Sequence, residues 1–157
     1  MKKLLVVMMV LAVAVAAFAQ EKDTRMDAGI RLGVRYGVSG RMFMGDNAIQ
    51  ALITMRNSGV ILTGMYQWHK PLEIGEIENL SWYFGGGAHV GYYSLGDWVA
   101  RNDLALGIDA VAGVEYDLET LISFPLKVSL EYKPSFDILG GWAGSFADFA
   151  LSAHYAF

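Results

Sequence analysis

The amino-acid sequence predicts an all-β protein, an eight-stranded antiparallel up-and-down transmembrane β-barrel that is preceded by a cleaved signal peptide. Three observations lead to this prediction. The chain begins with a basic and then apolar leader, its remaining residues alternate between apolar and polar over many short stretches, and it ends on an aromatic residue, Phe157. Alternation with a period of two is typical of strands that have one apolar and one polar face.

The leader has the three parts of a secretory signal. Lys2 and Lys3 precede an apolar run, residues 4–16, and Ala17-Phe18-Ala19 then supplies small residues at both key positions of a cleavage site. The alternative is an N-terminal membrane anchor, but the apolar run is shorter than the ~20 residues that a transmembrane helix needs. The sequence therefore predicts a signal peptide at residues 1–19 and one barrel domain at residues 20–157.

We expect the mature protein to begin near Gln20, because Ala19 meets the small-residue requirement of the processing enzyme. N-terminal sequencing of protein extracted from membranes checks this prediction. Recovery of Met1 would contradict it.

Composition excludes several classes of function. Without Lys2 and Lys3, ten of the 12 basic residues remain against 16 acidic residues, and no basic stripe is present, so nucleic acid is not expected as a partner. The chain has no cysteine, which rules out disulfides and thiolate metal sites. No apolar run after the leader is long enough for a spanning helix, so any membrane crossing must be made by strands.

The first half of the mature chain is predicted to form four strands. Residues 20–27 are polar and are expected to be a mobile lead-in. Alternation then predicts a strand from Ala28 to Tyr36, a turn at residues 37–40, a short return strand at 41–44 and a second turn at 45–47. A strand at 49–56, a tight hairpin at 57–59 and a strand at 60–68 follow, and residues 69–79 form a polar connection.

The second half alternates more clearly. It predicts strands at residues 80–92 and 104–116, separated by a loop at 94–102. After a connection through Pro125, the next strand either ends near Lys133 or continues through Pro134 to Ile138. A glycine-rich loop at 140–145 leads into the last strand, 147–157. Eight strands, an even number, place both termini on the periplasmic side.

The volume of the side chains on the two faces decides which face points outward. A soluble, lipocalin-like barrel would bury the apolar face, but an eight-stranded barrel has an interior only just wide enough for side chains to fill. The apolar face is too bulky for that space. The polar face is instead rich in glycine, which suits a crowded lumen: Gly29, Gly33, Gly85, Gly87, Gly91, Gly107 and Gly113. The apolar face is therefore predicted to meet lipid.

The end of the chain carries a family resemblance. Tyr155 and Phe157 occupy the third-last and last positions, and Phe149 and Leu151 continue the same face, although Ser152 stands where Gly is usual and Ala150 where a polar residue is usual. In this pattern the whole mature chain resembles the small outer-membrane barrels of the OmpA/OmpX type. The resemblance implies an outer-membrane monomer surrounded by lipid. It also implies that Phe149, Leu151, Tyr155 and Phe157 form an insertion signal, read by the barrel-insertion machinery after transport by periplasmic chaperones.

The inward face carries charges of both signs, which are predicted to be Arg31, Arg35, Arg41, Arg56, Lys127, Lys133, Asp109, Glu115, Glu131, Asp137 and Asp148. Opposite charges in a narrow lumen must pair or bear a large desolvation cost. The sequence therefore predicts a salt-bridged plug, in which Arg31, Arg35, Glu115 and Glu131 form one network. A narrow, porin-like channel for ions or small solutes is the alternative, although a ring of one sign would have favoured it more.

The sequence contains weak signals for chemistry. Ser152, His154 and Asp148 face inward on the last strand and could form a hydrolase triad, which makes a lipid-modifying enzyme the second alternative. Spacing alone is poor support for a triad, and the three histidines lie on separate strands without the spacing of metal ligands. We therefore expect a non-catalytic protein without metal or cofactor, with a structural or interaction role in the cell envelope.

Overall fold

The computed structural model describes residues 25–56, 59–75, 78–94, 102–140 and 145–157, and all statements below refer to them. They form one antiparallel sheet and a short helix, α2 (Glu119–Ile122). The strands are β1 (Arg25–Gly33), β2 (Tyr36–Met44), β3 (Asn47–Arg56), β4 (Gly59–Pro71), β5 (Leu80–Ser94), β6 (Asn102–Asp117), β7 (Leu126–Tyr132), β8 (Ser135–Leu139) and β9 (Phe149–Ala156). None of the helical residues described forms a segment long and apolar enough to cross a membrane.

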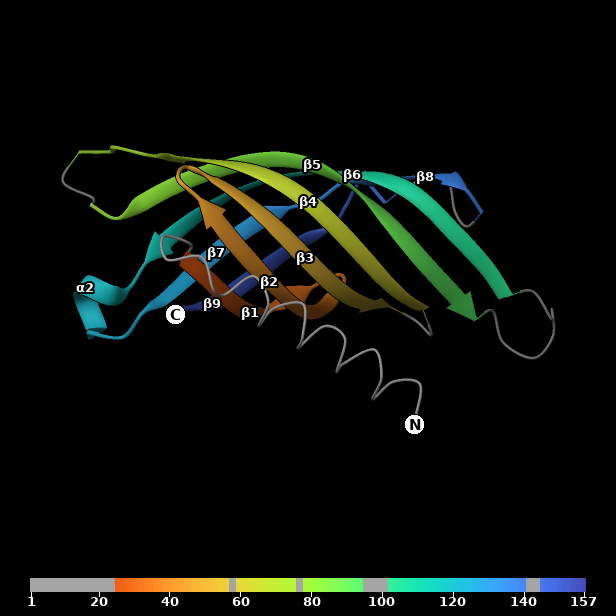
Figure 1. The fold of residues 1–157 in the computed structure, drawn as a ribbon, viewed down its shortest axis with the longest axis horizontal. Coiled ribbons are helices and arrows are strands. Elements are labelled where there is room, and N and C mark those ends of the chain that lie inside the picture. The colour runs from red at the N-terminus through yellow and green to blue at the C-terminus, as the bar shows by residue number, and fades with distance from the viewer. Residues whose placement is uncertain (1–24, 57–58, 76–77, 95–101, 141–144) are drawn as a thin grey trace.

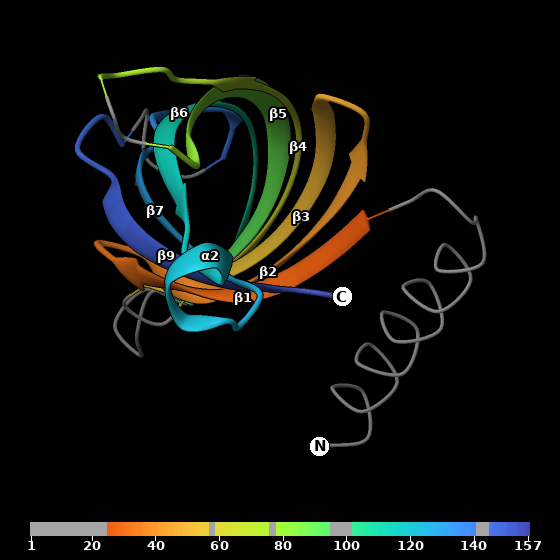
Figure 2. The ribbon, with the colours of Figure 1, turned by 90° about the vertical axis from the view of Figure 1, so that its left-hand side faces the viewer.

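The sheet closes into a barrel (Figures 1 and 2). Each strand from β1 to β6 pairs with the next, and β9 pairs with both β7 and β1. Both β7 and β8 pair with β6, each along a different part of it, so together they form one wall strand. The interruption falls at Pro134, which has no N–H to give to a ladder. The predicted eight-stranded antiparallel barrel is confirmed, with the seventh wall strand continuing past Pro134.

The strands differ in length, and this gives the barrel two unlike ends. β1 has nine residues and β6 has 16, and in Figure 1 the long β5 and β6 extend beyond their neighbours. We call the end that carries the start of β1, the end of β9 and α2 the terminal end, and the other the opposite end. The chain therefore begins and ends its barrel on the same side (Figure 2).

The apolar face points outward, as the side-chain volumes predict. Ile108 on β6 and Leu130 on β7 are 53% and 57% exposed, whereas Arg31 on β1 is 1% exposed. The interior also holds a small apolar group, made by Leu52, Met65, Tyr83 and Val111 from four consecutive strands. Polar and apolar side chains thus share the lumen, and the outer wall is apolar.

Two features of the first hairpin differ from the prediction. The turn lies at Val34-Arg35 rather than at residues 37–40, and Gly37 lies within β2, paired with Thr54. A Cβ on Gly37 would come 1.9 Å from the carbonyl oxygen of Ile53, so this glycine permits close approach of β3 instead of forming a turn. The start of the barrel is also earlier than expected, because β1 begins at Arg25 and contains part of the proposed lead-in.

Of the other connections that the structure describes, one agrees with the prediction and two differ from it. The turn between β2 and β3 lies at residues 45–46, while β4 continues through His69 to Pro71, into the region expected to be a polar connection. The helical turn α2 in the connection through Pro125 was not predicted. The signal peptide, the tip of the hairpin at 57–58, the loop at 95–101 and most of the glycine-rich loop, at 141–144, lie outside the described residues.

Candidate functional site: the charged lumen

The interior of the barrel holds a set of buried charged side chains, which come from β1, β2, β5, β6, the interrupted strand β7–β8 and the segments next to β1 and β9. They gather in three groups along the lumen, which we call the terminal, central and histidine clusters. The terminal cluster contains Asp27, Arg41, Glu115 and Lys127, the central cluster contains Arg31, Arg35, Glu131 and Asp148, and the histidine cluster contains His89, Asp109, Lys133 and Asp137.

The terminal cluster joins β1, β2, β6 and β7. The Arg41 guanidinium binds both carboxylate oxygens of Asp27, at 2.8 and 2.9 Å, and its third nitrogen lies 2.5 Å from Glu115. Lys127 Nζ lies 3.5 Å from Asp27 and 4.0 Å from Glu115. Two cations and two anions therefore balance. The contact of Arg41 with Asp27 is bidentate, which is the stronger kind of charge-assisted pair.

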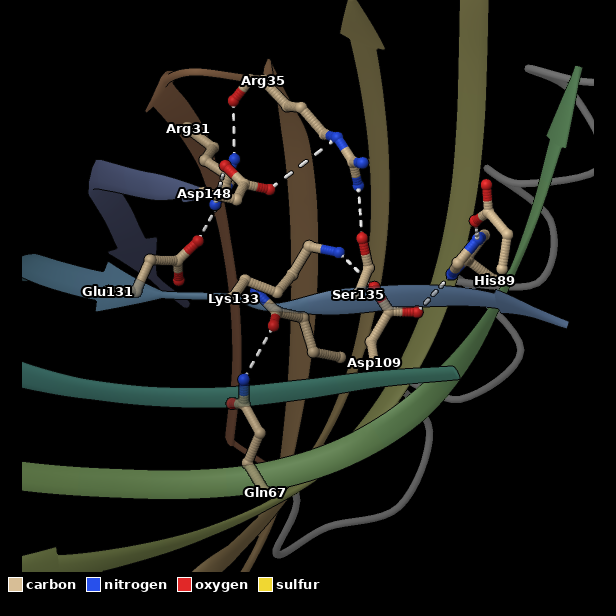
Figure 3. Close-up of polar contacts among 11 residues, drawn as sticks. Arg31, Arg35, Gln67, His89, Asp109, Glu131, Lys133, Ser135 and Asp148 are labelled. Atoms are coloured by element: carbon tan, nitrogen blue, oxygen red, sulfur yellow. Dashed lines mark hydrogen bonds and ion pairs between the residues drawn. The ribbon is translucent and has the colours of Figure 1, made fainter. Parts of the chain in front are cut away.

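The central cluster joins β1 to β7 and to the segment before β9 (Figure 3). Arg31 donates to Glu131 through Nε and to Asp148 through a terminal nitrogen at 3.1 Å, and it also donates to the carbonyl oxygen of Arg35 at 2.6 Å. Arg35 lies 3.9 Å from the other oxygen of Asp148 and donates to Ser135 at 3.2 Å. Arg31 and Asp148 are almost wholly buried, so the pairing occurs away from bulk water.

The histidine cluster joins β5, β6 and the interrupted strand β7–β8 (Figure 3). His89 contacts Asp109 through Nδ1 at 2.6 Å and Asp137 through Nε2 at 2.9 Å, and Lys133 donates to the other oxygen of Asp109. Ionised carboxylates only accept hydrogen bonds, so with both aspartates ionised the ring must donate through both nitrogens, as an imidazolium. Two cations then balance two anions here as well.

The structure separates residues that the sequence grouped together. Glu115 lies with Arg41 and Lys127 in the terminal cluster, whereas Arg31, Arg35 and Glu131 lie in the central one. The proposed single network of four is therefore wrong in its membership. The other lumen charges named from the sequence are buried or partly buried, except Arg56, whose side chain lies outside the described part.

The sequence analysis missed three residues of the lumen network or did not recognise their role. Asp27 was assigned to a mobile lead-in, yet it is 2% exposed and accepts from Arg41. Its position matches that of Arg31 in the alternation, so starting the predicted strand one residue earlier would have included it. His89 was considered as a possible metal ligand, and it connects two aspartates. The Tyr83 hydroxyl donates to Glu131 at 3.0 Å, which no sequence signal indicates.

Gly113 gives Tyr83 the space to reach the central cluster. A Cβ on Gly113 would lie 2.5 Å from the Tyr83 ring and 2.6 Å from its hydroxyl oxygen. We expect Gly113→Ala to displace the ring, break its bond to Glu131 and destabilise the barrel by about 1–3 kcal/mol, as overpacking in a filled interior does. Urea unfolding in liposomes, followed by tryptophan fluorescence, measures this loss.

Gly64→Ala is the matched control for that change. Gly64 is also a wall glycine, but a Cβ on it would meet nothing within 4 Å. Alanine there should leave stability unchanged or raise it slightly, because it reduces the freedom of the unfolded chain. Equal losses at Gly113 and Gly64 would show that the cost comes from the strand backbone and not from crowding in the lumen.

The residues considered for a hydrolase triad do not assemble into one. His154 Nε2 pairs with Ser39 at 2.7 Å, and Asp148 belongs to the central cluster, where it binds Arg31. His154 Nδ1 is buried without a hydrogen-bond partner among the described residues, so no carboxylate orients the ring as a triad requires. Within the same residues, no group of three or more His, Asp or Glu side chains is placed to hold a metal ion.

A cavity opens at the terminal end, and we call it the vestibule. Its volume is about 400 Å³, and the terminal cluster contributes Glu115 and Lys127 to its lining. The rest of the lining is mixed in charge and includes Arg25, Asp46, His69, Lys70, Asn79 and Asp117. Phe43 also lines it, with Arg25 and Lys127 each 4.6 Å from the ring centre. Solvent that enters the vestibule therefore reaches the lumen only as far as the paired charges of the terminal cluster.

The residues named as an insertion signal lie together on the outer face of β9 and at the chain end. Phe149, Leu151, Tyr155 and Phe157 are 56%, 64%, 39% and 75% exposed, and Tyr155 and Phe157 contact each other with ring centres 5.3 Å apart. A row of exposed apolar side chains is available to a receptor before it is covered by lipid. Their recognition by insertion machinery and chaperones stays a prediction.

Comparison with known proteins supports the architecture. No family model and no curated protein sequence matches the chain. Among solved structures, it is similar to the N-terminal β-barrel domain of Pseudomonas aeruginosa OprF, with a TM-score of 0.63 and 13% identity over 85% of this chain and 96% of that one. Neisserial surface protein A matches over the same shares with a TM-score of 0.47 and 12% identity. The similarity to the OprF domain, together with the closed sheet, shows that the chain has the fold of the small eight-stranded outer-membrane β-barrels, which its sequence also resembles.

Proposed function

We propose that this protein is a non-catalytic barrel of an outer membrane, with a lumen closed by paired charges and a structural or interaction role in the cell envelope. The observation that carries the proposal is the pairing of opposite charges across the lumen in all three clusters. In the central cluster, Arg31 contacts Glu131 and Asp148 from different parts of the wall at once. Such pairs hold the wall strands together, and the charges described in the lumen form no ring of one sign that would attract ions.

Location in a membrane is supported by the outer wall. Large apolar side chains cover it, as at Leu32, Ile108 and Leu130, each more than half exposed. Water would make a continuous apolar surface of this extent a site of aggregation, whereas lipid solvates it. Among the described residues, the strands from β1 to β7 and β9 pair on both sides, which satisfies their backbone groups as crossing a bilayer with strands requires, while β8 pairs along its length with β6 alone.

A narrow channel is the second candidate, and the vestibule favours it. A cavity of about 400 Å³ at the terminal end has the form of a channel mouth. For conduction, water would have to pass the terminal and central clusters, where Arg41 and Arg31 are 2% and 1% exposed. The clusters are therefore more consistent with a plug than with a wetted path.

Conductance in planar bilayers tests the proposal. The purified protein, folded in detergent and added to a bilayer, should give no stable conductance steps in potassium chloride. A matched preparation of a known porin shows that the assay detects channels. Reproducible steps that disappear when the protein is denatured would overturn the plug and favour the channel.

A further inference from the structure

The connection between β6 and β7 exposes an apolar surface at the terminal end. Leu121, Ile122 and Phe124 are 65%, 52% and 48% exposed, and none lies on the barrel wall. Between Leu118 and Pro125, which we call the apolar turn, the only charged residue is Glu119. Connections that face water are usually polar. The apolar composition of this turn therefore favours an apolar environment over water.

The apolar turn has a defined conformation. Helix α2 closes with Ser123 in the left-handed region, φ 53°, where the Ser123 N–H donates to the Glu119 carbonyl oxygen at 2.9 Å. The Leu118 N–H donates to the Leu126 carbonyl oxygen at 2.8 Å, and the Ala156 N–H of β9 donates to the Pro125 carbonyl oxygen at 2.9 Å. The turn is therefore fixed to the barrel wall at both its ends.

Polar groups at the start of the turn contact the ends of the neighbouring strands. Asn79, just before β5, donates to the Thr120 hydroxyl at 2.9 Å, and the Glu119 N–H donates to the Asp117 carboxylate at 3.0 Å. Asn79 and Asp117 both line the vestibule. The polar groups thus make local contacts within the protein, and the apolar side chains are left without a covering element among the described residues.

The exposed apolar surface is continuous with the lipid-facing wall. The Phe124 ring lies 5.2 Å from the Tyr155 ring on the outer face of β9, and Tyr155 in turn contacts Phe157. In Figures 1 and 2, α2 lies at the terminal end beside the chain terminus. A bilayer that meets Tyr155 on the wall therefore reaches the apolar turn without a polar gap.

We propose that the apolar turn is an interfacial anchor, in which Leu121, Ile122 and Phe124 insert into the boundary between headgroups and acyl chains of the leaflet at the terminal end. This inference rests on the proposed membrane location. Aromatic and aliphatic side chains on a short amphipathic element bind such a boundary by burying apolar area. The turn carries no cation, so its insertion does not depend on anionic lipid.

Site-directed labelling tests the anchor cleanly, because the chain has no cysteine. Three single-cysteine variants would carry a polarity-sensitive fluorophore in phosphatidylcholine liposomes: Ile122→Cys on the apolar side, Thr120→Cys on the polar side, and Leu130→Cys on the barrel wall. Lipids with a spin label near the headgroup and lipids with one deep in the acyl chain then quench each fluorophore according to its depth. Both leaflets contain the quencher, so the orientation of insertion does not matter.

The anchor predicts a blue-shifted emission at residue 122 with strongest quenching by the shallow spin label, water-like emission at 120, and strongest quenching by the deep label at 130. Water-like emission at 122 with lipid quenching at 130 would overturn the anchor, leave the membrane barrel intact, and indicate a protein partner for the turn. Water-like emission at both 122 and 130 would overturn the membrane location itself. A blue shift at 122 that appears only after phosphatidylglycerol is added to the phosphatidylcholine liposomes would also contradict the anchor, because it would show dependence on anionic lipid.

Discussion

Replacing Arg31 with methionine should lower the free energy of unfolding by about 3–5 kcal/mol, the usual cost of breaking a buried pair by removing one partner. Arg31 is 1% exposed and is the contact between Glu131 and Asp148. Its loss leaves Asp148 with Arg35 at 3.9 Å, but among the described residues it leaves Glu131 with the Tyr83 hydroxyl alone. Methionine is close in length to the arginine stem, so packing changes little. Urea titration in liposomes, followed by tryptophan fluorescence, measures the loss.

A double-mutant cycle separates charge pairing from packing. Adding Glu131→Gln to Arg31→Met should recover part of the loss, because the second change removes the orphan carboxylate. Adding Glu115→Gln should give only the sum of the two single effects, since Glu115 belongs to the terminal cluster and contacts Arg41 and Lys127. A loss below about 1 kcal/mol for Arg31→Met, as for solvated pairs, would mean that the lumen is hydrated.

The architecture of the barrel could be predicted because it depends on local alternation. Each wall strand carries its own signal of period two, and a shift by one residue would move every apolar side chain to the wrong face. The direction of the faces followed from volume, since bulky side chains such as Trp68 and Leu130 do not fit an eight-stranded interior. Both are exposed in the structure, at 42% and 57%.

The first hairpin was predicted wrongly because glycine has two uses in a barrel. A run such as Gly37-Val38-Ser39-Gly40 has the composition of a turn, but a glycine inside a wall strand can also permit close approach of a neighbour. The alternation continues through this run, with Val38 exposed and Ser39 buried. Periodicity was therefore the better guide than composition at this position. If periodicity had been weighted above composition at the start of the chain as well, Asp27 would have been assigned to the first strand.

The grouping of lumen charges could not be predicted, because the sequence gives the face of a residue and not its height in the barrel. Glu115 and Glu131 both point inward from strands that pair with each other, yet they bind different arginines. Height is determined by strand tilt and shear, which are properties of the closed sheet. The sequence likewise gave no sign that His89 on β5 would meet Asp137 on β8.

Replacing Ile108 with arginine should destabilise the membrane-inserted barrel by about 2–4 kcal/mol, the cost of an arginine on the lipid face near the bilayer midplane. Ile108 is 53% exposed on the outer face and lies in the middle part of β6, far from both barrel ends. Urea unfolding of the variant in liposomes measures the cost. The same measurement in detergent should give a smaller loss, because a micelle lets water and counter-ions reach the guanidinium more easily than a bilayer does.

Ile74→Arg is the control that makes this result specific to lipid. Ile74 is 51% exposed, nearly as much as Ile108, but it lies in the connection after β4 at the terminal end. Charge near an interface costs about 0–1 kcal/mol, so the two isoleucines should differ although their exposure is alike. Equal and small losses at both positions would contradict a lipid environment for the outer wall, because water solvates an arginine at either site. Equal and large losses would show that apolar packing, rather than depth in the bilayer, determines the cost.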